Sequence, residues 1–171
     1  MTRRALFNVA CLAAALGSGS CAYTTSSALL PAHLKTVAVP VFENATTEYA
    51  LEQEITQAVV DRFVQDNHLK VVDERSANSV LRGRVSQYRN AVFGFSATTQ
   101  ASEYRITIGV SVTMKDLVKN REMWKDDNLV KTTNYFVVDV PGQKARTELD
   151  GRKEAVQKIA DEIVSRTVEG W

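Results

Sequence analysis

Residues 103–117 read EYRITIGVSVTMKDL, and apolar and polar side chains alternate along most of this stretch. Tyr104, Ile106 and Ile108 begin the apolar series, which Val110, Val112 and Met114 continue. Successive side chains of a β-strand point to opposite faces, so period two predicts a long strand with one buried and one polar face. A strand with a single apolar face needs a second layer to cover it, which predicts a layered fold.

Further strands are predicted on both sides of this one. Residues 79–92 place Leu81, Gly83 and Val85 on one face, and they place Arg82, Arg84 and Tyr88 on the other. A turn at 119–120 leads into a returning strand over 122–130, which the pattern allows to continue to 138. Short strands are predicted over 36–42 and 69–72. Because Pro40 has no N–H to donate, the first of these is expected at a sheet edge or with a bulge.

Two amphipathic helices complete the pattern, over residues 48–65 and 145–168. In the first, Leu51, Ile55, Val59 and Phe63 recur at helical spacing, with Thr46 or Thr47 as the expected cap. In the second, the apolar stripe comprises Leu149, Val156, Ile159, Ala160 and Ile163. We therefore predict an α+β fold, a two-layer sandwich in which two helices pack on one face of a mixed sheet of four main strands.

The pattern of residues 1–21 is typical of a targeting segment. Arg3 and Arg4 precede an apolar stretch over 5–16 and small residues over 17–20, as in a secretory signal peptide. Cys21 follows at once, which predicts cleavage after Ser20 and lipidation of the cysteine thiol. The alternative is an ordinary signal peptide, because the Leu expected three residues before the cysteine stands at Leu16 instead. The predicted organisation is a signal peptide over 1–20, a lipidated N-terminus and tether over 21–34, and a single domain over 35–171.

Charge and composition exclude several functional classes. The chain has 21 Lys and Arg against 20 Asp and Glu, so loss of two leader arginines leaves 19 − 20 = −1. This weak net charge predicts no nucleic-acid partner. His33 and His68 lack partners at metal-ligand spacing, and phosphate-loop and nucleophile-elbow motifs are absent from the sequence. We therefore expect no enzyme activity, no metal and no cofactor.

Two sets of residues are candidates for binding. Arg82, Arg84 and Arg105 fall on polar strand faces, where their guanidinium groups suit a phosphorylated or carboxylated ligand. The alternative is a solvated face paired with local acids. Phe93 and Phe95 are predicted at a hairpin tip, either contacting a partner or folding back onto the sheet edge. Trp124 is expected in the core.

In their order and spacing, several motifs resemble the lipopolysaccharide-assembly lipoproteins called LptE. They are Cys21-Ala22-Tyr23, the run from Leu30 through Thr36-Val37-Ala38-Val39-Pro40 to Asn44, Leu51-Glu52, Leu81-Arg82-Gly83-Arg84-Val85, Glu103-Tyr104-Arg105-Ile106-Thr107 and the closing Glu169-Gly170-Trp171. The resemblance implies an outer-membrane lipoprotein, anchored by its N-terminal lipid with its domain on the periplasmic side. It implies a plug inside the β-barrel of LptD, a role in assembling that barrel, and contact with lipopolysaccharide. On this basis we expect Arg82, Arg84 and Arg105 to approach lipid phosphates.

Another class of function stays open at this point. Residues 36–44 and the helix that follows them also resemble the opening of curli-secretion lipoproteins and of lipoprotein activators of peptidoglycan synthases. Those proteins act as oligomeric or enzyme-activating binding modules. Co-purification separates the two classes, because a plug stays bound to a large barrel protein.

Overall fold

A computed structural model describes residues 30–96 and 100–170, and its centre is a sheet of three long antiparallel strands. These are β4 (Ser79–Phe95), β5 (Ala101–Asp116) and β6 (Arg121–Phe136). The short strands β1 (Thr36–Ala38), β2 (Glu43–Asn44) and β3 (Lys70–Val71) extend the sheet on the β4 side. The order is β3-β1-β4-β5-β6, and β2 also pairs with β4. Parallel pairing of β1 with β3 and β4 makes the sheet mixed.

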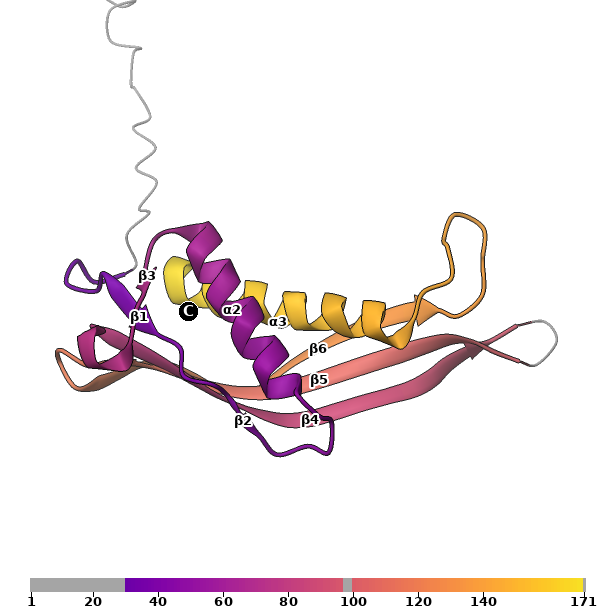
Figure 1. Ribbon diagram of the computed structural model, residues 1–171, viewed down its shortest axis with the longest axis horizontal. Coiled ribbons are helices and arrows are strands. Elements are labelled where there is room, and N and C mark those ends of the chain that lie inside the picture. Colours follow the sequence, from indigo (N-terminus) through magenta and orange to yellow (C-terminus); the bar gives the residue numbers. More distant parts are fainter. Residues whose placement is uncertain (1–29, 97–99, 171) are drawn as a thin grey trace, which may run out of the picture.

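Both long helices, α2 (Leu51–Asp66) and α3 (Glu148–Glu169), lie on the same face of this sheet (Figure 1). They contact each other, and α3 also lies over β5 and β6. The predicted α+β architecture with two helices on one face is confirmed. Within the described residues the sheet has six strands, of which three are long.

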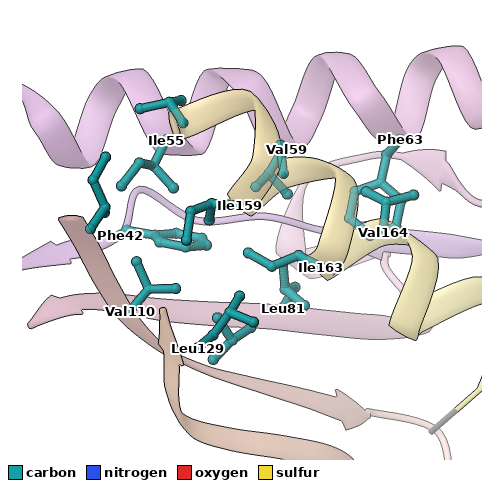
Figure 2. Packing of buried hydrophobic residues seen from close by; sticks show 14 of the residues in the cluster. Phe42, Ile55, Val59, Phe63, Leu81, Val110, Leu129, Ile159, Ile163 and Val164 are labelled. Carbon is teal, nitrogen blue, oxygen red and sulfur yellow. The ribbon is translucent and has the colours of Figure 1, made fainter. Parts of the chain in front are cut away.

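The core lies between the helices and the sheet. Figure 2 shows Ile55, Val59 and Phe63 of α2 beside Ile159 and Ile163 of α3, above Leu81 and Val110 of the sheet. All of these side chains are buried. The apolar periodicity of both helices and of β5 therefore converges on one continuous cluster, whose burial drives folding. Trp124 is buried in this cluster, as predicted.

Two glycines in the core make room for aromatic rings. A Cβ added to Gly83 would lie 2.1 Å from the Phe42 ring, and one added to Gly151 would lie 2.8 Å from the Tyr135 ring. Neither distance is tolerable between carbon atoms, so both positions need a residue without a side chain. Gly151 therefore has a packing role that offsets its weak helix propensity.

Two local predictions, for the helix cap and for Leu149, are wrong, and the prediction for the first strand holds in one of its two forms. Strand β1 ends at Ala38 and lies between β3 and β4, so it is not an edge strand. Pro40 falls between β1 and β2, where the chain gains one residue relative to β4, as the predicted bulge requires. The residue at the start of α2 is Ala50, at φ 61° with no side-chain cap, whereas Thr46 bonds to Asn44. Leu149 is 47% exposed because it lies in the first turn of α3, ahead of the buried stripe.

A bulge in β4 overturns one face assignment. The register between β4 and β5 shifts between Val85 and Gln87, which inserts an extra residue at Ser86. Tyr88 therefore lies opposite Ile108, on the helix side, and its hydroxyl donates to Glu148 at 2.6 Å. Burial and this carboxylate raise the pKa of Tyr88 well above its usual value. The predicted place of Tyr88 on the polar face is wrong.

Candidate functional site: the open face of the sheet

The face of β4, β5 and β6 opposite the helices is the candidate site, and we call it the open face. Figure 1 shows both helices on the other side of these strands. On β5 the open face carries the polar partners of the buried series, including Arg105, Thr107, Ser111, Thr113 and Lys115. Strand pairing then assigns their neighbours on β4 and β6 to the same face, since paired residues point the same way.

One end of the open face is basic. Arg82 pairs in register with Thr113, which pairs in turn with Lys125 across three strands. Arg84 and Lys115 lie nearby on the same face. We call Arg82, Arg84, Lys115 and Lys125 the basic end.

Local acids neutralise part of this charge. Arg82 pairs with Glu74, and the Lys125 ammonium lies 2.8 Å from Asp127, whose hydrogen bond and charge raise the pKa of Lys125. Arg84 forms no ion pair within residues 30–96 and 100–170, although Glu43 is its backbone neighbour on β2. Of the predicted arginines on this end, Arg84 is the one whose guanidinium group stays available for an anionic ligand.

Arg89 is a candidate that the sequence analysis missed. It pairs with Thr107, which places it on the open face between the basic end and the hairpin, and its side chain is exposed. Simple alternation from Leu81 assigns Arg89 to the buried face, and the bulge at Ser86 reverses that assignment. The adjacent Gln87-Tyr88 pair gives no sequence signal for a bulge, so only the structure reveals this position.

Arg105 lies apart from the other two predicted arginines. Arg105 pairs with Ala91, whereas Arg84 pairs with Ser111. Because Ser111 lies six residues after Arg105 on β5, Arg84 and Arg105 are separated by roughly 20 Å along the strands. The Arg105 guanidinium carbon lies 3.4 Å from the centroid of the Phe93 ring, and the Arg105 Nε donates to Asn134 at 2.8 Å. Arg105 is thus held by a cation–π contact and a hydrogen bond.

The aromatic candidates lie within strand β4. Phe93 is 49% exposed beneath Arg105, and Phe95, the last residue of β4, is 65% exposed. Phe136 at the end of β6 faces the same end of the sheet and is half-buried. We call Phe93, Phe95 and Phe136 the aromatic end. Phe93 and Phe95 lie roughly 35–40 Å from Arg82 along β4 at the rise of a strand.

Metal binding and membrane crossing by a helix find no support in the described part of the chain. Within residues 30–96 and 100–170, His, Cys, Asp and Glu side chains form no cluster of three that suits a metal ion. Neither α2 nor α3 has the combination of length and apolarity that crossing a bilayer requires. Cys21, the predicted lipidation site, lies outside the described residues.

Comparison with known proteins identifies the family. The model of the LptE family, described as lipopolysaccharide-assembly, matches residues 34–167. The chain belongs to the LptE family. The match spans the sheet, all of α2 and most of α3, so it covers nearly all of the described domain rather than one motif. A search of curated proteins finds no match.

Solved structures share the fold at low sequence identity. A protein from Xanthomonas campestris aligns with a TM-score of 0.56 at 13% identity, over 81% of this chain and 89% of its own. A minor lipoprotein from Acinetobacter baumannii aligns at 0.51 and 13%, over 80% and 94%. The PelC dodecamer from Paraburkholderia phytofirmans aligns at 0.50 and 14%, over 81% and 90%. At these identities the likeness concerns the fold alone.

Proposed function

We propose that this LptE-family protein is an outer-membrane lipoprotein that plugs and helps assemble the barrel of LptD and assists lipopolysaccharide transport to the cell surface. The family match over residues 34–167 carries the proposal. The domain stands on the periplasmic side, held by a lipid on Cys21, and its partners are LptD and lipopolysaccharide. No catalytic step is part of this function.

The open face supports lipopolysaccharide as the ligand. Lipopolysaccharide joins phosphorylated sugars to acyl chains, and the open face has cations near one end and exposed aromatic rings at the other. Arg84 and Arg89 are the exposed arginines that we assign to phosphate, with Arg82 released from Glu74 as the ligand binds. Arg105 orients Phe93 through their stacking contact, and it contributes its remaining N–H groups.

The protein partner is tested by affinity purification of the tagged protein from detergent-solubilised membranes of its source cells. We expect one large β-barrel protein, LptD, to be recovered in stoichiometric amount after stringent washing. Intact-mass measurement of the same sample should show cleavage before Cys21 and the added mass of acyl chains. A Cys21→Ser variant, which cannot be lipidated, is the control for the mass shift.

Two outcomes contradict the proposal. Recovery of a peptidoglycan synthase, or of a homo-oligomeric ring without a barrel protein, assigns the chain to the alternative class of binding modules. A mature mass without acyl chains rejects the anchor while leaving the plug open to separate test.

A further inference from the structure

The turn between β5 and β6, residues 117–121, lies at the end of the sheet where the chain enters the domain, and we call it the tip turn. Asp116, the last residue of β5, accepts from His33 at 2.8 Å. The Leu117 N–H donates at 2.8 Å to the carbonyl of Asn78, just before β4. Figure 1 shows β1 and β3 at this same end of the sheet. The tip turn is therefore beside the place where the segment that follows Cys21 joins the domain.

The tip turn combines exposed apolar side chains with cations. Val118 is 60% exposed, and the neighbouring Leu117 is also exposed. Lys119 and Arg121, which follow in the same turn, are exposed as well. This composition suits the boundary of a bilayer, where apolar side chains enter the headgroup region while basic ends stay with the lipid phosphates.

Other exposed cations lie at the same end of the sheet. Lys35 and Lys70 are adjacent, since the Lys70 N–H donates to the Lys35 carbonyl at 3.0 Å. Within residues 30–96 and 100–170, neither of these side chains nor that of Lys119 forms an ion pair. Arg121 lies 3.8 Å from Asp116, a carboxylate that His33 already contacts. This end of the domain therefore presents cations that local acids do not neutralise.

The length of the preceding segment limits how far this end can lie from an anchor on Cys21. Leu30 is nine residues after Cys21, and nine residues span at most about 30 Å when fully extended. Strand β5 has 16 residues, so its other end lies about 50 Å from the tip turn at the rise of a strand. A lipid on Cys21 therefore confines the tip turn near the bilayer but does not confine the aromatic end.

We infer that the tip turn docks on the surface of the membrane that holds the lipid. Leu117 and Val118 enter the headgroup region, and Lys119 and Arg121 contact the phosphates of anionic phospholipids. The attraction between basic side chains and an anionic membrane falls off within a Debye length, so the anchor is needed to bring them close. The inference rests on the lipidated Cys21 of the proposed function, and it adds which end of the domain faces the bilayer. Docking in this way points the aromatic end away from the membrane.

The test places the mature lipidated protein in vesicles of phosphatidylcholine mixed with phosphatidylglycerol, with no barrel protein present. A fluorophore is attached through Glu122→Cys, beside the tip turn, or through Gln143→Cys, beyond β6 at the other end of the sheet. Lipids with a nitroxide headgroup quench a fluorophore that lies at the membrane surface. We expect quenching to be several-fold stronger at position 122 than at position 143, and this difference should shrink at high salt.

A paired substitution tests the tip turn itself. Val118→Gln with Lys119→Glu changes two exposed side chains and leaves the backbone N–H groups that bond to Asp116 in place. The matched control, Val138→Gln with Lys144→Glu, makes the same changes at exposed positions beyond β6. Read from the fluorophore at position 122, the tip-turn variant should reduce the ratio of docked to undocked protein at least about tenfold, since it reverses a charge beside an anionic surface. The control should dock as the wild type does.

Intact mass, measured first, separates failure of this inference from failure of the proposed function. A mature chain without acyl chains rejects the anchor, and the docking of the tip turn falls with it. A lipidated chain that is quenched equally at positions 122 and 143 overturns the docking alone. So does a tip-turn variant that docks as well as the control, or equal quenching at position 122 in vesicles of phosphatidylcholine only.

Discussion

At the residue scale, Asp116 is a buried carboxylate that joins the β5–β6 turn to the segment before β1. Its side chain is fully buried at the end of β5, and its Oδ2 accepts from His33 Nε2 at 2.8 Å. Its Oδ1 accepts the N–H groups of Val118 and Lys119 at 2.9 and 3.0 Å. Asp116 therefore closes the β5–β6 turn and fastens the segment before β1 to it. The sequence pattern places His33 in the predicted tether and does not indicate this contact.

We predict that Asp116→Asn lowers the free energy of unfolding by about 1–3 kcal/mol, the usual cost of losing hydrogen bonds to a buried charge. Burial opposes ionisation of Asp116, but the Lys119 N–H, His33 and the Val118 N–H outweigh it and hold its pKa below the usual value. A lowered folded-state pKa stabilises the fold above the unfolded-state pKa of about 3.9, and this stabilisation is lost as pH falls through the folded-state value.

Urea unfolding between pH 2 and pH 7 measures both effects. The wild type should lose stability below about pH 4. The asparagine variant should lose less over the same interval, because it lacks the titrating group. Equal pH dependence of the two proteins contradicts this account of Asp116.

At the element scale, the sequence predicts what periodicity controls and misses what tertiary contacts control. The alternation from Tyr104 to Met114 predicts β5, and the spacing of Leu51, Ile55 and Phe63 predicts α2. The left-handed Ala50 at the start of α2 makes no side-chain cap bond, so no cap residue in the sequence signals this helix start. The bulge at Ser86 likewise changes the face of Tyr88 and Arg89 without a local motif. The sequence therefore predicts the open face as a polar face of the sheet, but it does not place Arg89 on that face.

Arg152 joins the two helices. Its guanidinium group lies between them and pairs with Glu48, just before α2, and with Glu54 in its first turn, the latter at 2.8 Å. Its side chain is only 17% exposed. Solvent and salt screen the attraction in such a shielded salt bridge less than in a surface pair. Removal of Arg152 would leave both carboxylates without their partner.

We predict that Arg152→Ala lowers the free energy of unfolding by about 1–3 kcal/mol. The neighbouring Lys153→Ala, an exposed position on the same helix, should change it by less than about 0.5 kcal/mol. Chemical denaturation of both variants measures the difference. If the two substitutions cost the same, Arg152 does not hold α2 against α3.

At the scale of the whole molecule, the two-layer fold places the residues that stabilise it and the residues proposed to bind a ligand on opposite faces of the sheet. The helices and one side of the sheet bury the apolar core, and the opposite side keeps Arg84, Arg89, Phe93 and Phe95 exposed. An antiparallel sheet can leave one face in contact with water, because alternation along its strands places polar side chains on that face. The arrangement gives an LptE-family protein an extended surface that suits an amphipathic lipid.

The most direct test of this account is lipopolysaccharide binding by a chain with Arg84→Glu and Arg89→Glu. The control carries Lys144→Glu and Lys153→Glu, an equal change of charge at exposed positions outside the open face. At low salt we expect the open-face variant to bind lipopolysaccharide at least about tenfold more weakly, since each basic side chain near an anionic lipid surface contributes about 1 kcal/mol. The difference should shrink at high salt, and the control should bind as the wild type does. Equal binding by both variants at low salt contradicts the open face as the lipopolysaccharide site.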